Sequence, residues 1–340
     1  MHQIFLVLGV LARFGDRQGV HVPLNEAFEA FDALQDMPPD LLMGYATGYS
    51  ADVIDVFINT FQRVSPARIV LFTRDGVWPR GLECHRPDQV TVVSIRALGL
   101  SRAVRQMPVV TRRFYAYRQW LARHGSAYGR IIVADVRDTF FQSDPFDSVR
   151  RAEQVYLFEE GVSLQHEPYY NQPWIRDCAG QATLDHLLAQ DPMVVCAGVI
   201  AAGTVRAFAA LLDALVPLLA RGCNDQGALN IVAPQIQHPR IKRMPMAASF
   251  VANALQQWNP GHPDAHIRTK LVPLHVRRDR IGRVLNANGH PYAIVHQADR
   301  DPALWQLRLR LRGSIPAKYD IHKIEAAWAP YHVAETNATA

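Results

Sequence analysis

Two acidic residues follow a short apolar run near the middle of the chain. Asp135 and Asp138 come after Ile131–Ala134, within the stretch GRIIVADVRDTFFQSDPF. Four consecutive apolar residues predict a buried strand, so both carboxylates are expected where that strand ends. Two neighbouring carboxylates repel each other unless a cation lies between them. Either Arg137 or a divalent metal ion such as Mg²⁺ or Mn²⁺ can supply the positive charge, because hard ions prefer carboxylate oxygen.

A turn of small and polar residues, Ala46-Thr47-Gly48-Tyr49, follows another apolar run. Gly48 can serve only to make a tight turn between a strand and a helix, because glycine adopts backbone conformations that other residues avoid. Alternatively, the ring of Tyr49 can stack on a nucleotide base while backbone groups of the turn read the edge of the base. The residues alone leave both interpretations open.

Two later stretches carry further candidate residues. Asp225 and Gln226 follow Asn224 at the expected start of a helix, and either Asn224 or Asp225 can cap that helix. A capping residue can also take part in catalysis, so the two roles do not exclude each other. His296 follows the apolar run Ala293–Val295 and is either a structural residue or a metal ligand.

The elements that must position these residues alternate along the chain. Apolar runs predict strands over residues 41–45, 67–73, 88–95, 131–134, 155–158 and 193–200. Helical periodicity predicts helices after Ser50 and over residues 111–124 and 204–219. This alternation favours an α/β fold with a mostly parallel central sheet flanked by helices. Ligands of such sheets bind at the carboxyl ends of the strands, so Thr47-Gly48-Tyr49 and the two acids are expected to face one cleft.

Composition limits the class of protein. The chain has 340 residues, of which 49% are hydrophobic and 20% charged, which is ordinary for a globular protein with a substantial core. The net charge of +5 comes mainly from arginines that are spread along the chain. Nucleic acid is therefore not an expected partner. An anionic small molecule fits this charge, and peripheral association of the basic surface with an acidic membrane remains an alternative.

Cysteine spacing and the N-terminus predict the compartment. Cys84, Cys178, Cys196 and Cys223 do not have the spacing of metal ligands, so we expect free thiols in a reducing compartment. The apolar run at residues 4–12 is too short to span a bilayer and lacks the features of a signal peptide. We therefore expect a cytoplasmic protein, with the inner membrane surface as a second possible location.

The order of these motifs resembles that of the GT-A fold, nucleotide-sugar-dependent glycosyltransferases, and is distantly similar to glycosyltransferase family 8, the glycogenin-like enzymes. The resemblance covers residues 41–300 and rests on the Thr-Gly-Tyr turn, the Asp-x-x-Asp stretch, the Asp-Gln pair and the late histidine. Three departures stand out. The acids read D-V-R-D rather than D-x-D, Cys196 stands where family 8 usually has asparagine, and the Lys-Pro-Trp ending of that family is absent.

The resemblance implies a division of the chain and a set of roles. Residues 1–40 would be an N-terminal arm, 41–300 a single GT-A (Rossmann-like) domain and 301–340 a peripheral segment. Within the domain, residues 41–146 would bind the nucleotide and residues 147–300 the acceptor. The implied metal ligands are Asp135, Asp138 and His296. The implied residues for the nucleotide sugar are Ala46, Thr47, Tyr49, Arg113, Arg118, Asp135, Gly198 and Arg300, with Arg118 and Arg113 as rivals for the same contact.

The implied reaction moves a sugar from a nucleoside diphosphate sugar, with UDP favoured, to an acceptor hydroxyl. It would depend on Mn²⁺ or Mg²⁺, and Asp225 and Gln226 would be the catalytic residues. The Asp-Gln pair favours retention of configuration at the anomeric carbon. The acceptor would be a glycan, a lipid-linked saccharide or a small molecule. Two alternatives stay open: another Mg²⁺-dependent phosphate-processing enzyme, such as a phosphatase or nucleotidyltransferase, or a binding protein whose catalytic site has decayed.

Overall fold

The computed structural model describes residues 37–82, 84, 86–253, 277–300, 304 and 307. The chain forms two compact units, Met1–Pro39 and Asp40–Ala340, and every helix and strand given below belongs to the second. The apolar run at residues 4–12 lies outside the described residues, as does nearly all of the segment 301–340.

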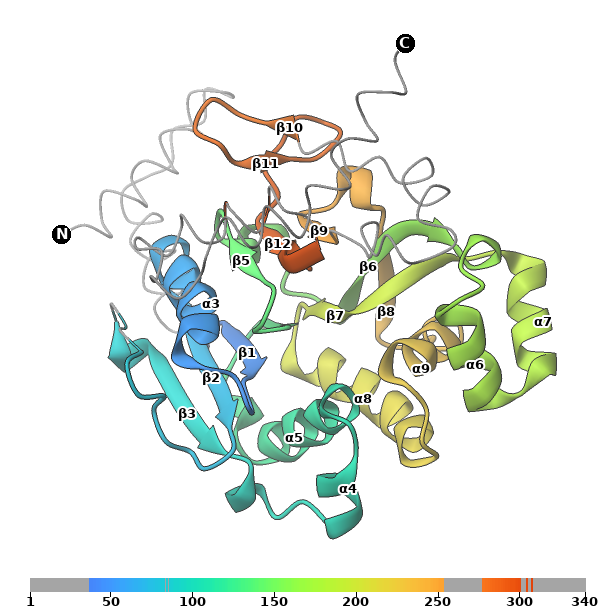
Figure 1. The fold of residues 1–340 in the computed structure, drawn as a ribbon, viewed down its shortest axis with the longest axis horizontal. Helices are drawn as coiled ribbons and strands as arrows, with labels where there is room; N and C mark the ends of the chain where they lie inside the picture. Colours follow the sequence, from blue (N-terminus) through green and yellow to red (C-terminus); the bar gives the residue numbers. More distant parts are fainter. Residues whose placement is uncertain are drawn as a thin grey trace, which may run out of the picture. The chain divides into compact units, whose positions relative to one another are not determined.

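A seven-stranded sheet forms the centre of this unit, in the order β3-β2-β1-β4-β7-β6-β8 (Figure 1). Its strands are β1 (Leu41–Tyr45), β2 (Arg68–Thr73), β3 (Val90–Ser94), β4 (Ile131–Ala134), β6 (Gln154–Ser163), β7 (Met193–Ala202) and β8 (Arg240–Met244). All neighbouring strands run parallel except β7, which is antiparallel to β4 and β6. The predicted α/β fold with a mostly parallel sheet is thus confirmed.

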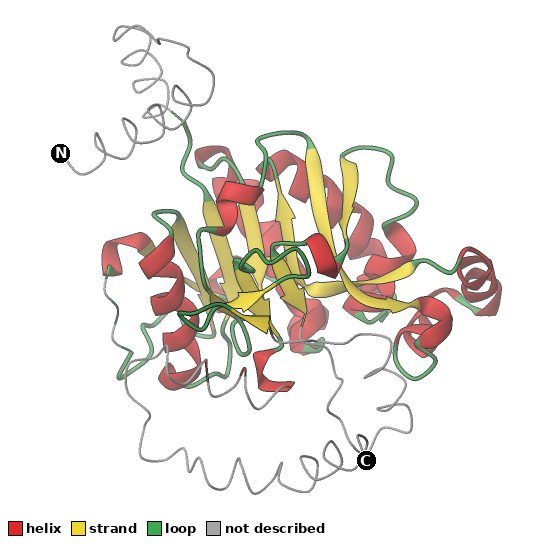
Figure 2. Ribbon diagram, turned by 90° about the horizontal axis from the view of Figure 1, so that it is seen from above, coloured by secondary structure: helices red, strands yellow, loops and turns green. Residues whose placement is uncertain are grey.

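Helices cover both faces of the sheet (Figure 2). They are α3 (Ala51–Val64), α4 (Arg102–Gln106), α5 (Val109–His124), α6 (Asn171–Ala179), α7 (Gln181–Gln190), α8 (Val205–Ala220) and α9 (Asp225–Val232). Residues of β1 alternate between the two faces, as the two-residue period of a strand requires. Leu41 and Met43 pack in one core with side chains of α5, α8 and α9, whereas Leu42 packs in a second core with α3.

Two small sheets complete the described part. One joins β5 (Phe140–Phe141), β12 (Ile294–His296) and β9 (Val251–Asn253), and the other pairs β10 (Arg277–Arg278) with β11 (Val284–Leu285). Strand β5 follows the acids of the main sheet, and its pairing with β12 brings the late part of the chain next to them. His296, the last residue of β12, therefore lies close to residues more than 150 positions earlier in the sequence.

The expectation of four free thiols is wrong for two of them. Cys178 and Cys223 form a disulfide with a Cα–Cα distance of 4.7 Å, which lies in the usual range for such bonds. The packing of α6 against α9 brings these residues together across 45 positions, so their spacing gave no signal. Only Cys84 and Cys196 are free, which removes the argument from cysteine usage for a reducing compartment.

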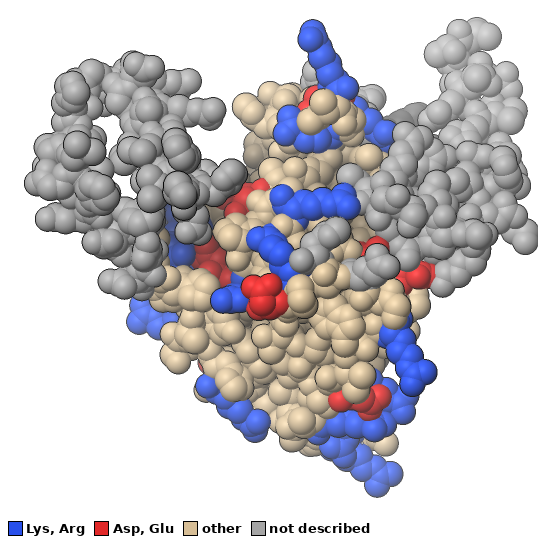
Figure 3. Space-filling view, turned by 90° about the vertical axis from the view of Figure 1, so that its left-hand side faces the viewer, with Lys and Arg blue, Asp and Glu red and all other residues tan. Residues whose placement is uncertain are grey.

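Two surface properties bear on the expected partners. On the face drawn in Figure 3, Lys and Arg side chains lie at several separate places with acidic residues among them, and they do not form one continuous patch. None of the helices in the described part of the chain has the length and apolar character that a membrane span requires.

Candidate metal and substrate site

The two acids lie in the loop that follows β4. The backbone N–H of Asp135 donates to the carbonyl of Gly198 in β7 (2.9 Å), and the carbonyl of Asp138 accepts from the N–H of Ala298 after β12 (2.9 Å). These bonds fix the loop to two segments that are distant in the sequence. The Asp138 side chain is almost fully buried, and that of Asp135 is one-third exposed.

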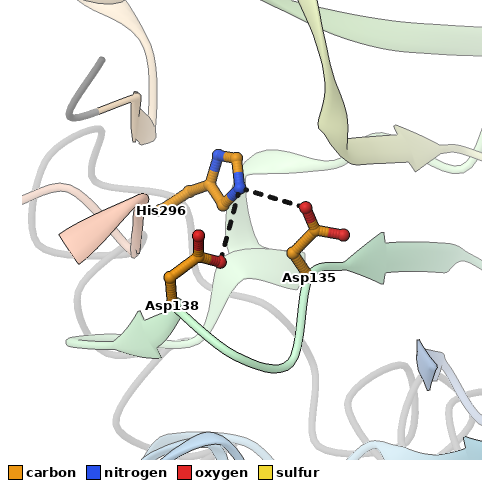
Figure 4. Close-up of side chains that lie close together, drawn as sticks. All are labelled: Asp135, Asp138 and His296. Atoms are coloured by element: carbon orange, nitrogen blue, oxygen red, sulfur yellow. Dashed lines mark ion pairs between the residues drawn. The ribbon is translucent and has the colours of Figure 1, made fainter. Parts of the chain in front are cut away.

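His296 faces both carboxylates (Figure 4). Its Nε2 lies 3.5 Å from Oδ2 of Asp135 and 3.7 Å from Oδ1 of Asp138. One ligand atom from each residue lies within 4.8 Å of the other two, which is close enough for all three to bind one metal ion. The structure therefore brings together the three residues that the sequence analysis named as metal ligands.

Gly198 makes room for this arrangement. A Cβ atom at this position would lie 2.2 Å from Cε1 and 2.4 Å from Nε2 of His296, and 3.0 Å from Oδ2 of Asp135. Even alanine would therefore collide with the imidazole ring. The carbonyl of Gly198 also accepts the hydrogen bond from the N–H of Asp135. Gly198 therefore contributes to the site in two ways: its carbonyl holds Asp135, and the absence of a side chain leaves room for His296.

Arg113, and not Arg118, supplies a positive charge from α5. The buried guanidinium of Arg113 pairs with Oδ1 of Asp135, and its Nη2 lies 2.7 Å from Oδ2 of Asp225 and 2.9 Å from the carbonyl of Ala197. Arg118 is half exposed and pairs with Asp213 of α8 (2.7 Å). Five residues along a helix turn a side chain by about 140°, so the two arginines face different ways.

Arg137 neutralises the second acid. Its Nη2 lies 3.1 Å from Oδ2 of Asp138 and 3.2 Å from Oδ2 of Asp299. The sequence analysis offered Arg137 as a possible source of positive charge for both acids. In the structure Arg137 pairs with Asp138, and a different arginine, Arg113, pairs with Asp135. The arginines use Oδ1 of Asp135 and Oδ2 of Asp138, whereas the other oxygen of each carboxylate faces His296. A metal ion could therefore bind without displacing either arginine.

The protonation of His296 fits a ligand. Burial lowers the pKa of its imidazole below the ordinary value, although the charge of Asp138 acts in the opposite direction. The neutral form is the one that can bind a metal ion. Nε2 of His296 is buried and makes no hydrogen bond to the described residues.

Arg113 links Asp225 to the metal-binding group, because its guanidinium pairs with the carboxylates of both Asp135 and Asp225. Gln226 is the next residue in the chain. The side chain of Asn224 accepts from the N–H groups of Gln226 and Gly227 and so caps α9. Burial raises the pKa of the Asp225 carboxyl, and its pairing with Arg113 opposes the rise. Gln226 is half-buried; its Oε1 accepts from the N–H of Ala197 (3.3 Å), and its Nε2 donates to Oδ1 of Asn171 (3.1 Å).

The turn after β1 lies near Asp138. Gly48 has a φ of +87°, a conformation that favours glycine, and Ala46 is buried. Burial raises the pKa of the half-buried Tyr49 hydroxyl, and the charges of Arg137 and Asp138 also act on it, so the hydroxyl lies within electrostatic range of Asp138. Oγ1 of Thr47 is buried and has no hydrogen-bond partner in the described part of the chain.

Three further residues concern the site: Arg300, which the sequence analysis named, and Asn171 and Asn253, which it did not. Arg300 ends the short 3₁₀ helix Ala298–Arg300, but its side chain lies outside what the structure describes, so its contact with a diphosphate stays a prediction. Asn171 contacts Gln226, and Asn253 contacts His296. No motif in the sequence pointed to either asparagine, because both contacts depend on how distant segments pack.

Comparisons with known proteins add structural likenesses only. No protein-family model matches the sequence, and no curated protein matches it. The chain is similar to the galactosyltransferase LgtC solved with donor and acceptor sugar analogs, at 11% identity and a TM-score of 0.47, covering 82% of this chain and 98% of that one. It is also similar to mouse xyloside xylosyltransferase 1, at 12% identity and a TM-score of 0.43, covering 76% and 97%.

A third solved structure is the glycosyltransferase GlyE of Streptococcus pneumoniae, at 12% identity and a TM-score of 0.48, covering 88% of this chain and 64% of that one. Likenesses at this level of identity do not establish a family. The function therefore has to be argued from the residues of the site.

Proposed function

We propose that the chain is a divalent-metal-dependent glycosyltransferase that moves a sugar from a nucleoside diphosphate sugar to an acceptor hydroxyl. The observation that carries this proposal is the group formed by Asp135, Asp138 and His296 at the carboxyl end of β4. It lies at the edge of the sheet where α/β proteins bind their ligands. The order of motifs from the Thr-Gly-Tyr turn to the late histidine supports the same class.

The ligand set fits Mn²⁺ or Mg²⁺. Two carboxylate oxygens suit a hard divalent ion, and one imidazole nitrogen suits Mn²⁺ better than Mg²⁺ because transition metals accept nitrogen ligands readily. When bound, the ion would stabilise the negative charge that develops on the departing diphosphate. Two features of this chain fit an ion at this place: Gly198 lets His296 and Asp135 approach β7 closely because it has no side chain, and Nε2 of His296 is buried without a hydrogen bond to the described residues.

The other residues would hold the donor around this group. Tyr49 would stack on the base, with Ala46 and Thr47 beside it, because the hydroxyl of Tyr49 lies within electrostatic range of Asp138. Oγ1 of Thr47, which is buried without a partner among the described residues, would gain one from the nucleotide. UDP is the favoured nucleotide on the resemblance of this turn to family 8.

Arg113 would orient the acids rather than contact the diphosphate directly. Its guanidinium is buried, with Nη1 paired with Asp135 and Nη2 bonded to Asp225 and the Ala197 carbonyl, so only its Nε remains without a partner among the described residues. Arg118 has no place in the proposal, since it pairs with Asp213. Arg300 remains the proposed residue for the diphosphate.

The environment of Asp225 favours a retaining reaction. A general base must be ready to take the proton of the acceptor hydroxyl, but the carboxylate of Asp225 is buried against Arg113 and also accepts the N–H of Gln226 (2.9 Å). We assign Asp225 to holding Arg113, and Gln226 to the face of the donor sugar where transfer takes place. The proposed acceptor is a glycan, a lipid-linked saccharide or a small molecule.

Calorimetric titration with UDP, GDP, CMP and their sugars, each with and without Mn²⁺, tests the proposal. Binding of one nucleoside diphosphate only in the presence of Mn²⁺, together with slow hydrolysis or transfer of its sugar, would support it. Phosphate release from nucleotides that carry no sugar would favour the phosphatase or nucleotidyltransferase alternative. Binding that is equally strong without metal would mean that the three ligands are assigned wrongly.

A further inference from the structure

His296 has two ring nitrogens with different surroundings. Nε2 faces Asp135 and Asp138 at 3.5 and 3.7 Å, whereas Nδ1 lies 3.0 Å from Oδ1 of Asn253. The two residues are direct partners in the register of the parallel strands β12 and β9. The pairing of the two strands therefore places the two side chains next to each other.

The orientation of the Asn253 amide follows from its other contacts. Asn253 is fully buried, and its Nδ2 lies 3.3 Å from the carbonyl oxygen of Glu159 and 3.5 Å from that of Phe158, both in β6. A carbonyl oxygen can only accept a hydrogen bond, so the NH₂ group must face β6. The oxygen of the amide must then face His296.

This orientation decides which ring nitrogen carries the proton. Oδ1 of Asn253 can only accept, so Nδ1 of His296 must donate, and the neutral ring then has its lone pair on Nε2. The thiol of Cys196 also lies 3.7 Å from Nδ1, but a thiol can donate or accept and imposes neither tautomer. The lone pair of Nε2 therefore points at two carboxylate oxygens, an arrangement that a shared cation would stabilise.

We propose that Asn253 is a positioning residue that holds His296 in the Nδ1–H tautomer and so makes Nε2 the metal-binding atom of the site. The inference rests on the proposed metal site and adds the residue that prepares one of its ligands. Partners of this kind fix the ring orientation of metal-binding histidines in many proteins, and their loss typically weakens metal binding about 10–100-fold.

The first test measures the tautomer in the unmodified full-length chain, without metal. Isotope-labelled histidine gives the nitrogen chemical shifts of all the rings, and the His296→Gln variant identifies the signals of His296 by their absence. At neutral pH we expect a protonated Nδ1 and an unprotonated Nε2. A ring protonated at Nε2 alone would overturn the proposal, whatever the affinity for metal.

The second test measures Mn²⁺ affinity by calorimetry, with the metal alone and no nucleotide. Asn253→Leu keeps a side chain of similar size but removes the acceptor, so we expect about 10–100-fold weaker binding. Asn253→Asp restores an acceptor for Nδ1 but places its second oxygen against the carbonyls of Glu159 and Phe158, so we expect only part of that loss to be recovered. An unchanged affinity in Asn253→Leu would overturn the role of Asn253.

A control separates this role from a loss of stability. Asn286 is also buried, and among the described residues its side chain bonds only to backbone groups, those of Ser249, Asn288 and His290. Asn286→Leu should lower the unfolding temperature but leave Mn²⁺ affinity unchanged. An equal loss of affinity in Asn286→Leu would assign the effect of Asn253→Leu to stability. If the unmodified chain bound no Mn²⁺, the metal site and this inference would both fall.

Discussion

An arginine–aspartate cluster lies at each end of β4, and the two clusters differ in how completely their polar groups are used. At the amino end, Arg130 pairs with Asp40 through Nε (3.0 Å) and Nη2 (2.5 Å), while its Nη1 donates to the carbonyl of Val149 (2.9 Å). We call this the Arg130 cluster. Each nitrogen of the guanidinium has a partner within the chain, so contacts within the fold account for the whole cluster and no ligand is needed to explain it.

The cluster at the carboxyl end leaves polar atoms without partners. Arg113 binds Asp135 and Asp225, and we call these three residues the Arg113 cluster. Nε of Arg113 and Nε2 of the neighbouring His296 are both buried and make no hydrogen bonds within the described residues. Folded proteins satisfy almost all buried polar groups, so the exceptions at this end indicate a place for a ligand. The same residue types thus serve the fold at one end of a strand and, we infer, the substrate at the other.

The largest expected effect comes from Asp138→Asn, beside the Arg113 cluster. The change is nearly isosteric but removes the negative charge of one metal ligand, so we expect Mn²⁺ affinity to fall by at least about 100-fold. Metal-dependent nucleotide binding should disappear with it. Calorimetry measures both affinities, and circular dichroism checks that the fold is intact. Full Mn²⁺ affinity in this variant would contradict the inference that the carboxyl end of β4 binds a metal ion.

Gly198→Ala tests whether the close approach of His296 to β7 serves the metal site. The added methyl group would overlap the ring of His296, so the ring or the strand must move. We expect Mn²⁺ affinity to fall about 10–100-fold, as for other changes that misorient a ligand, and the free energy of unfolding to fall by about 1–3 kcal/mol. Ala201→Gly, at a buried position three residues along β7 from Gly198, is a control that changes β7 without adding a methyl group against His296.

Asp40→Asn should give the opposite pattern. It weakens the Arg130 cluster, in which both side chains are largely buried, and a hydrogen bond to a charged group contributes about 1.5–3 kcal/mol. We expect urea denaturation to show a loss of that size, with Mn²⁺ and nucleotide affinities unchanged. A clear loss of metal affinity would mean that the two ends of β4 are coupled, and the distinction between them would fail.

The sequence predicted the fold better than it predicted the site. Apolar runs such as Ile131–Ala134 reveal buried strands because burial on both faces leaves no room for polar residues. The grouping of Asp138 with His296 could not be derived from periodicity, since it depends on the pairing of β5 with β12. It was predicted only through the resemblance to a known family.

The details of the site depended on packing that the sequence does not display. Arg113 and Arg118 lie on one helix but face different partners. Arg113 pairs with Asp135 of the site and Arg118 pairs with Asp213, and the sequence alone does not show this difference. Asn253 gave no signal, since an asparagine in a short strand has no motif. The disulfide between Cys178 and Cys223 was missed for a related reason, because α6 and α9 meet only in the folded chain.

The smallest expected effect comes from Arg118→Ala. Arg118 lies five residues after Arg113 in the same helix, so the variant compares an exposed arginine with the buried one at the site. Arg118 and Asp213 are both more than half exposed, and exposed ion pairs contribute about 0.2–1 kcal/mol because water and salt screen them. We expect a loss of stability within that range, smaller still at high salt, and unchanged affinities for Mn²⁺ and nucleotide. Urea denaturation at two salt concentrations and calorimetry provide the measurements. If nucleotide binding weakened instead, Arg118 would replace Arg113 as the arginine of α5 that serves the site, and the burial of polar groups would no longer distinguish functional from structural arginines in this fold.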